Sequence, residues 1–285
     1  MTVLAETFSL TNGNAIPKIG FGTWLIDDAD AADAVREAIA VGYRHIDTAQ
    51  AYGNEVGVGK GICRSQIARE DLFVTTKLRA EIKNESEAER AIDGSLNALG
   101  LDRIDLLIIH SPQPWTHFRE GDYAEGNKAA WRALEAAYED GRVSAIGVSN
   151  FLETDLEPLL ASANVAPMVN QVLAHVGNMP NRLIDFCRER DIVVEGYSPF
   201  GHGNVLGNDT IAAVARKHGV SPAQVCVAYV LARGLVTLPK ASSREHMIAN
   251  AQVDFVLDSD DMALLEGLVL RDYGEDVAFP CYAHA

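Results

Sequence analysis

The sequence has few cysteines, no long hydrophobic run and a shortage of basic residues. Its four cysteines are scattered with no CxxC spacing, which argues against a disulfide framework or a cysteine-rich metal site. No apolar segment approaches membrane-spanning length, and residues 1–6 lack the basic-then-apolar signature of a secretory signal. With 24 basic against 40 acidic residues the net charge is −16, unlike that of proteins that bind nucleic acids or anionic membranes. We therefore expect a cytoplasmic protein with neither partner.

The composition is that of an ordinary globular protein. The chain of 285 residues is 48% apolar and 22% charged, so it can bury a full-sized core. No Pro/Gly/Ser-rich linker divides it. We expect one domain covering residues 1–285.

Strand-like and helix-like segments alternate along almost the whole chain. Residues 8–10 and 15–18, joined through Asn12-Gly13, predict a β-hairpin. Eight strands follow, at residues 19–23, 43–47, 72–77, 104–110, 144–148, 168–172, 192–197 and 236–239. The helices are expected at residues 30–41, 54–62, 86–99, 127–139, 152–161, 181–190, 210–218, 222–233, 244–250 and 260–268. Ser86-x-x-Glu89 resembles a capping box that would start the third of these helices, and residues 271–285 show no regular pattern.

Eight such units predict an α/β fold, a (β/α)8 TIM barrel with an N-terminal β-hairpin and extra C-terminal helices. The alternative is a doubly wound open sheet, which would need a glycine-rich turn after the first strand. No such turn is present. Gly57-x-Gly59-x-Gly61 falls within a predicted helix, so we interpret it as a packing feature, and the Walker pattern is absent.

Polar residues follow seven of the predicted strands at their carboxyl ends. These residues are Asp47, Lys77, His110, Ser149-Asn150, Asn170-Gln171, Tyr197-Ser198 and Lys240. A helix cap, a lysine reaching solvent or a buried histidine would explain any one of them. Because the strand ends of a barrel converge on one face, seven together favour a functional site.

The residue types at this face suit proton donation to an oxygen atom. Asp47 and Lys77 would form an ion pair, and the Lys77 ammonium would lower the pKa of nearby Tyr52 from its usual value of about 10. His110 would hydrogen-bond a substrate oxygen. The sequence offers neither a nucleophile–base pair nor a cluster of metal ligands, so we expect no metal and infer a cofactor. Tyr197 would present a ring face to it, Asn150 and Gln171 would bind an amide, and Lys240 would bind a phosphate.

With these residues, the chain resembles members of the aldo-keto reductase family. The shared motifs are Gly42-Tyr43-Arg44-His45-Ile46-Asp47-Thr48-Ala49, Tyr52-Gly53-Asn54-Glu55, Thr76-Lys77-Leu78, Ile109-His110, Gly147-Val148-Ser149-Asn150-Phe151, Val169-Asn170-Gln171, Tyr197-Ser198-Pro199 and Leu238-Pro239-Lys240. The short tail and the short segment after Tyr197 are similar to the bacterial branch that includes the diketogluconate reductases.

The resemblance implies a catalytic tetrad of Asp47, Tyr52, Lys77 and His110, with Tyr52 as general acid. Hydride would come from C4 of a reduced nicotinamide stacked on Tyr197. The implied cofactor-binding residues are Gly22, Thr23, Asp47, Ser149, Asn150, Gln171, Tyr197, Ser198, Phe200, Lys240, Ser242, Ser243, His246 and Asn250. The implied substrate-binding residues are Trp24, Tyr52, His110 and Ser111.

Three positions depart from the family pattern. Ser111-Pro112 replaces the usual Trp-Pro, which removes an aromatic wall unless Trp115 supplies it. The positions that usually hold a serine and an arginine near the cofactor's 2′-phosphate are Ala241 and His246, and the adenine-side glutamate is Ala249. Arg244 is a candidate substitute for that arginine, although each residue along a helix turns the side-chain direction by roughly 100°. We expect NADPH as cofactor, with a weakened preference and usable NADH.

The expected function is NAD(P)H-dependent reduction of small aldehydes, ketoaldehydes or ketones to alcohols by a monomer. Two alternatives remain open from the sequence. One is a Schiff-base aldolase with Lys77 as nucleophile, and the other is a non-catalytic nicotinamide-binding barrel subunit. The segments that would set substrate choice, residues 111–126, 201–208 and 271–285, have the least pattern.

Overall fold

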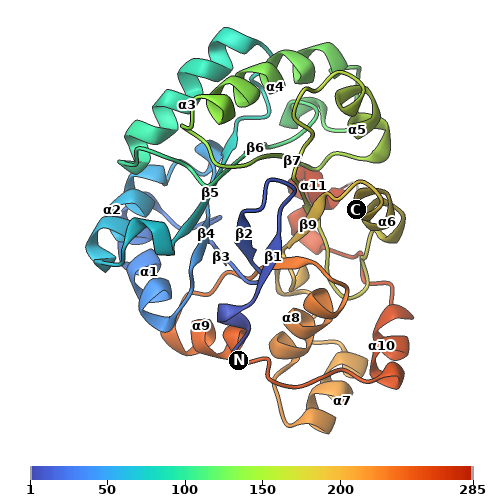
Figure 1. Ribbon diagram of the computed structural model, residues 1–285. Coiled ribbons are helices and arrows are strands. Elements are labelled where there is room, and N and C mark those ends of the chain that lie inside the picture. Colours follow the sequence, from blue (N-terminus) through green and yellow to red (C-terminus); the bar gives the residue numbers. More distant parts are fainter. Residues whose placement is uncertain (1, 284–285) are drawn as a thin grey trace.

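Eight parallel strands form the centre of the molecule and neighbour one another in chain order (Figure 1). The computed structural model describes residues 2–283. The strands are β3 (Phe21–Gly22), β4 (His45–Asp47), β5 (Phe73–Leu78), β6 (Leu106–Ile109), β7 (Ile146–Ser149), β8 (Val169–Leu173), β9 (Val193–Tyr197) and β10 (Val236–Leu238). A parallel bridge between Ile19 and Thr237 joins the first strand region to the last, so the sheet closes on itself. The predicted (β/α)8 barrel is confirmed.

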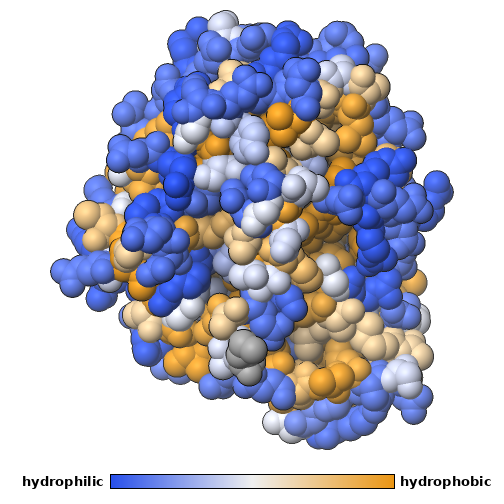
Figure 2. Space-filling model, in the orientation of Figure 1, coloured by the Kyte–Doolittle hydropathy of each residue, from blue (hydrophilic) through white to orange (hydrophobic). Residues whose placement is uncertain are grey.

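Helices surround this barrel and follow the strands in sequence. They are α1 (Asp28–Val41), α2 (Glu55–Ser65), α3 (Glu85–Leu99), α4 (Ala124–Glu139), α5 (Glu153–Leu160), α6 (Asn181–Arg188), α7 (Asp209–His218), α8 (Pro222–Ala232), α9 (Arg244–Ala251), α10 (Ser259–Glu266) and α11 (Pro280–Ala283). Figure 2 shows largely hydrophilic outer surfaces on α3 and α4, as expected for amphipathic helices that cover a core. Among residues 2–283, no helix is long and apolar enough to cross a membrane.

The glycine pattern of α2 is a packing feature, as predicted. A Cβ atom added at Gly59 would overlap the Leu99 carbonyl of α3, and one at Gly57 would overlap the Asp28 carbonyl of α1. A Cβ at Gly61 would be 2.7 Å from the Ala32 carbonyl oxygen. The three glycines therefore let α2 approach both neighbouring helices closely.

The hairpin of β1 (Thr7–Ser9) and β2 (Ala15–Pro17) covers one end of the barrel, in the foreground of Figure 1. Leu10 and Ile16 pack into an apolar interior cluster with strand residues such as Leu106 and Val236. The side-chain amide of Asn12 donates to the Ser144 carbonyl oxygen at 2.8 Å. This end is thereby closed, which leaves the carboxyl ends of the strands as the open face.

Two local predictions were wrong. The cap of α3 is Asn84, whose side chain accepts a hydrogen bond from the Glu87 backbone N–H, so Ser86 lies inside the helix. The tail is also ordered: residues 274–278 form a 3-10 turn and α11 follows. Tyr273 and Tyr282 of the tail are buried against Leu173 of β8. These short turns are stabilised by aromatic contacts with the barrel. They have no hydrophobic period, so the sequence pattern did not predict them.

Candidate active site

A cavity of about 590 Å³ opens at the carboxyl ends of the strands. Twelve of the predicted site residues line it, namely Gly22, Trp24, Asp47, Tyr52, His110, Ser149, Asn150, Gln171, Tyr197, Ser198, Phe200 and Lys240. These residues come from seven strands or the segments that follow them. The barrel topology therefore brings together side chains that are up to about 200 residues apart in the sequence.

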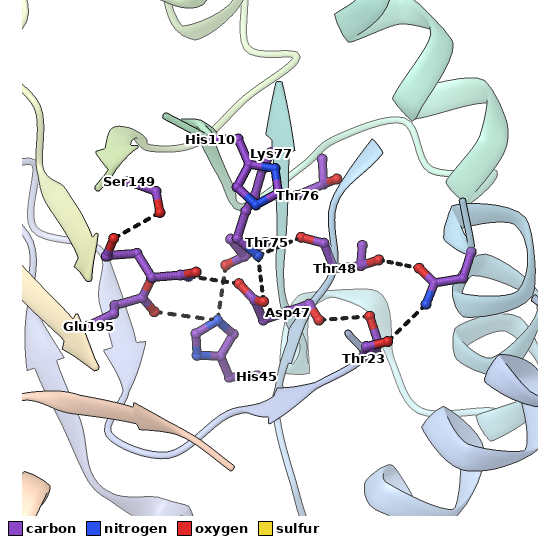
Figure 3. A network of polar contacts seen from close by, with 12 residues as sticks. Thr23, His45, Asp47, Thr48, Thr75, Thr76, Lys77, His110, Ser149 and Glu195 are labelled. Carbon is purple, nitrogen blue, oxygen red and sulfur yellow. Dashed lines mark hydrogen bonds and ion pairs between the residues drawn. The ribbon is translucent and has the colours of Figure 1, made fainter. Parts of the chain in front are cut away.

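Lys77 and Asp47 form the expected ion pair beneath the cavity (Figure 3). The Lys77 Nζ atom lies 2.5 Å from Asp47 Oδ1 and also donates to the Thr48 carbonyl oxygen at 2.8 Å. Burial of Lys77 favours the uncharged amine, but Asp47 and Tyr52 more than offset burial, so the pKa of Lys77 is raised. Lys77 is therefore held as an ammonium ion, and its side chain is 0% exposed.

Tyr52 ends a short 3-10 turn after β4, and its ring lies close to both charged and aromatic groups. The Lys77 ammonium is 4.9 Å from the Tyr52 ring centroid, and the His110 ring meets Tyr52 edge-on at 5.6 Å. The predicted net lowering of the Tyr52 pKa was wrong. Burial raises this pKa to about 12, while the charge of Lys77 opposes the rise. At neutral pH Tyr52 is a protonated phenol, the form that can donate a proton.

His110 follows β6 and is neutral at physiological pH. Burial, and then the charge of Lys77, lower its pKa well below the usual value. Its Nδ1 atom has no hydrogen-bond partner within residues 2–283. Trp115 meets the imidazole edge-on at 5.1 Å and lines the cavity. Trp115 thus supplies the aromatic wall that the Ser111-Pro112 sequence removes.

Ser111 itself does not reach the cavity. It is fully buried, its Oγ atom accepts a hydrogen bond from the Gln113 backbone N–H, and its carbonyl accepts one from Lys83 at 2.9 Å. Thr23 also lies outside the lining, with its hydroxyl donating to the Asp47 carbonyl oxygen. Thr23 therefore contacts a site residue, Asp47, from outside the cavity, whereas the contacts of Ser111 are with Gln113 and Lys83.

A second cluster of polar side chains lies on β7, β8 and β9, with Asn150 directly after β7. Asn150 Nδ2 donates to the His110 carbonyl oxygen at 3.0 Å, and Asn150 Oδ1 accepts from the Tyr197 hydroxyl at 2.8 Å. Gln171 Nε2 donates to Asp47 Oδ2 at 2.8 Å and to Glu195 Oε2 at 3.0 Å. The Ser149 hydroxyl donates to the Gln171 carbonyl oxygen. Asn150 has a φ of 62°, a left-handed conformation that asparagine tolerates better than most residues.

These residues fit a nicotinamide ring with its carboxamide. The Tyr197 ring lines the cavity, and both N–H groups of the Gln171 amide already donate to carboxyl oxygens, one of Asp47 and one of Glu195. The amide oxygen of Gln171 is then the atom available to accept a hydrogen bond from a ligand amide. Lys240 at the other end of the lining adds a cation for a phosphate group.

The remaining predicted cofactor residues lie on or before α9, outside the cavity lining. Ser243 caps α9 by accepting from the His246 backbone N–H, His246 is exposed, and Asn250 is buried. Arg244 forms an ion pair with Glu37 of α1. Ser242 lies in the loop between β10 and α9 and is exposed. The structure thus leaves Lys240 as the lining cation and ties Arg244 to an acidic neighbour.

Several cavity residues were missed in the sequence. Phe279 and Cys281 line the cavity from the tail, and His202, which pairs with Asp276 at 2.7 Å, lines it from the segment after β9. No periodic signal marked them. Glu195 is different, because it is an acidic residue inside the apolar run of a predicted strand, and that interruption was a usable signal.

Comparisons with known proteins agree with this geometry. Residues 18–269 match the model of the Aldo/keto reductase family. The chain is 40% identical over 269 residues to the glyoxal reductase of Bacillus subtilis, covering 94% of each chain. It is 37% identical over 286 residues to an aldehyde reductase of Saccharomyces cerevisiae, covering 93% of this chain and 91% of that protein.

Solved structures give the same result. An aldo/keto reductase from Brucella melitensis is 38% identical with a TM-score of 0.86, covering 92% of this chain and 98% of that chain. An aldo-keto reductase of Bombyx mori in complex with NADP is 33% identical with a TM-score of 0.83, covering 92% of each chain. The chain belongs to the aldo/keto reductase family.

Proposed function

We propose that this protein reduces small aldehydes, ketoaldehydes or ketones to alcohols, with Tyr52 as proton donor and a reduced nicotinamide as hydride donor. The observation that carries the proposal is the Asp47–Lys77 ion pair held against the Tyr52 ring at the floor of the cavity. A protonated phenol beside a fixed ammonium is suited to donate a proton to a developing alkoxide. The bound cofactor would supply the hydride from C4 of its nicotinamide.

Each member of the tetrad has a distinct role in this proposal. Tyr52 gives its proton to the carbonyl oxygen, and Lys77 stabilises the phenolate that remains. Asp47 keeps Lys77 charged and oriented through the 2.5 Å contact. Neutral His110 directs a ring nitrogen at the substrate oxygen and so orients the carbonyl.

We propose NADPH as the preferred cofactor, with NADH also used. Tyr197 would stack on the nicotinamide, and Ser149, Asn150 and Gln171 would surround its carboxamide. At the other end Lys240 would contact phosphate, with Ser198 and Phe200 between. Lys240 without a free neighbouring guanidinium supports a moderate preference for the 2′-phosphate.

The cavity walls support small carbonyl substrates. Trp24, Trp115 and Phe279 line the cavity as aromatic walls, and Trp24 and Phe279 meet edge-on at 4.9 Å. The relatives named glyoxal reductase and aldehyde reductase fit this substrate class. Membership in the diketogluconate-reductase branch, a single-domain cytoplasmic monomer and activity on oxidised sugars are parts of the same proposal.

The aldolase alternative is disfavoured by the position of Lys77. A Schiff-base lysine needs an uncharged amine that reaches the substrate. Lys77 has a raised pKa, is engaged by Asp47 and Thr48, and is not among the residues that line the cavity. The non-catalytic alternative predicts a different result, because such a subunit would bind the cofactor without reducing any carbonyl compound.

The test compares wild type with Tyr52→Phe, following NADPH and NADH absorbance separately with glyoxal, methylglyoxal and simple aldehydes. We expect wild type to oxidise both cofactors, NADPH faster. Tyr52→Phe removes the acidic proton and should lower kcat by about 10²–10⁴-fold while leaving the Kd for NADPH nearly unchanged. Cofactor binding without turnover across the panel would instead establish the non-catalytic alternative, and a product trapped by borohydride on Lys77 would establish the aldolase.

A further inference from the structure

An acidic side chain lies inside the barrel, one layer below the cavity. Glu195 precedes Tyr197 by two residues on β9, so both side chains leave the same face of the strand. Tyr197 lines the cavity, whereas Glu195 is 0% exposed. The barrel interior near it includes the apolar residues Val169 and Val236. A carboxyl group buried at this depth destabilises the fold unless it makes hydrogen bonds. The hydrogen-bond partners of Glu195 therefore indicate what it does.

The main contact of Glu195 is with Gln171, its register partner on β8. Gln171 Nε2 donates to Glu195 Oε2 at 3.0 Å and to Asp47 Oδ2 at 2.8 Å. A primary amide has two N–H donors and one acceptor oxygen, and both donors are used here. Glu195 and Asp47 therefore hold the amide from two sides and determine which way its oxygen points.

The two carboxyl groups are not equivalent. Asp47 is paired with Lys77 through its other oxygen, at 2.5 Å. Glu195 Oε1 has no hydrogen-bond partner within residues 2–283, and the nearest basic group is His45 Nε2 at 3.8 Å. That nitrogen already bonds the Thr75 hydroxyl at 2.9 Å. Glu195 is the member of the pair that lacks a countercharge.

The surrounding charges favour a neutral Glu195. The titratable groups that act on it are Asp47 and His45 on β4 and Lys77 on β5, while β10 on its other side contributes Val236 in register. Burial, and then the charge of Asp47, raise the pKa of Glu195 to about 8. Burial lowers the pKa of His45 to about 3. At neutral pH both Glu195 and His45 are uncharged.

We propose that Glu195 is a positioning residue of the site: in its neutral form it fixes, with Asp47, the Gln171 amide so that the amide oxygen receives the nicotinamide carboxamide. This inference rests on the proposed function. When Glu195 ionises, its negative charge and that of Asp47 repel each other across the Gln171 amide. The added negative charge also opposes binding of an anionic cofactor.

The experiment measures the Kd for NADPH by fluorescence titration or calorimetry from pH 6.5 to 9, together with kcat and KM. The variants are Glu195→Gln, which keeps an acceptor oxygen but cannot ionise, and Glu195→Leu, which removes the acceptor. Thr237→Val is the matched control, because Thr237 is a buried residue of neighbouring β10 whose hydroxyl has no partner within residues 2–283.

In wild type and Thr237→Val we expect the Kd for NADPH to rise several-fold between pH 7 and 9. Glu195→Gln should bind like wild type at pH 7 and lack the part of this rise that Glu195 causes. Glu195→Leu should bind NADPH about tenfold more weakly at pH 7, as expected for the loss of one ordered hydrogen bond, with a smaller change in kcat than in the KM for NADPH.

The inference is overturned if Glu195→Gln keeps the full wild-type pH dependence, or if Glu195→Leu folds and binds NADPH as tightly as wild type. If Glu195→Leu does not fold, the pH dependence of Glu195→Gln still decides. Failure of wild type to bind NADPH or reduce any carbonyl would instead overturn the proposed function, so the two failures are distinguishable.

Discussion

Arg244 is the guanidinium nearest in sequence to Lys240, and its side chain is held by Glu37 of α1. Both side chains are partly exposed, at 51% and 29%, so the pair is screened by solvent and contributes little to stability. The pair should instead affect cofactor binding, because an arginine paired with a carboxylate is less available to bind a phosphate group. The ion pair with Glu37 is therefore the structural reason for the weakened NADPH preference that we propose.

Glu37→Gln should release Arg244 and strengthen discrimination for NADPH over NADH. We expect the ratio of the two kcat/KM values to rise up to about fivefold, the limit for a screened surface pair, and the Kd for NADP⁺ to fall in parallel. Arg244→Ala should leave the ratio unchanged or lower it. Glu85→Gln is the control, since Glu85 forms a comparable surface pair with Arg132 between α3 and α4. An unchanged ratio in Glu37→Gln would show that Arg244 cannot reach the 2′-phosphate.

At the scale of elements, the tail forms part of the cavity. Its 3-10 turn and α11 bring Phe279 and Cys281 to the lining, and the Tyr282 hydroxyl donates to Ser198 Oγ at 2.7 Å. Tyr273, earlier in the tail, is anchored separately through its hydroxyl to His175 at 2.8 Å. The residues after Ala278 can therefore be removed while the Tyr273–His175 hydrogen bond is kept.

Truncation after Ala278 should widen the cavity mouth and change substrate selection. We expect the ratio of kcat/KM for a bulky aromatic aldehyde over that for glyoxal to increase about tenfold, the scale of one lost apolar contact. The Kd for NADPH should change little, because Tyr197, Gln171 and Lys240 remain. Phe279→Ala is the smaller matched change and should move the ratio in the same direction. Equal losses for both aldehydes would show that the tail acts on the chemistry rather than on the pocket.

Elements with a hydrophobic period could be predicted from the sequence, whereas elements fixed by tertiary contacts could not. The eight strands and their helices follow hydrophobic periodicity, so the barrel and the polar lining residues at strand ends were predictable. Gly22, Trp24 and Phe200 were predicted only from the family resemblance. The tail could not be predicted, because short turns fixed by tertiary aromatic contacts have no period. The cap of α3 was placed at Ser86 instead of Asn84 because both residue types cap helices and the capping-box pattern of Ser86-x-x-Glu89 does not distinguish them. The Tyr52 pKa was predicted in the wrong direction because the sequence reveals the neighbouring charge but not the depth of burial.

At the scale of the whole molecule, buried groups with shifted pKa values make stability depend on pH in opposing ways. Burial lowers the pKa of His45 to about 3 and that of Lys83 to about 7. For both groups the unfolded chain binds more protons, His45 below pH 6.5 and Lys83 above pH 7, so stability falls as pH falls through those ranges. Glu195 has the opposite sign. Its pKa rises from 4.5 to about 8 on folding, so the folded state holds the extra proton between those values.

Comparing the pH dependence of two variants isolates the Glu195 contribution. Between pH 5.5 and 7.5 the free energy of unfolding of wild type should fall relative to that of Glu195→Gln by about 1.4 kcal/mol per pH unit. The difference should become constant well below pH 4.5, where Glu195 is protonated in both states, and well above its folded pKa, where it is ionised in both states. Urea unfolding at half-unit intervals measures it, and Thr237→Val should give a difference from wild type that does not vary with pH. A flat difference for Glu195→Gln as well would mean that Glu195 is ionised inside the folded barrel, and then the neutral carboxyl that positions Gln171 could not exist at pH 7.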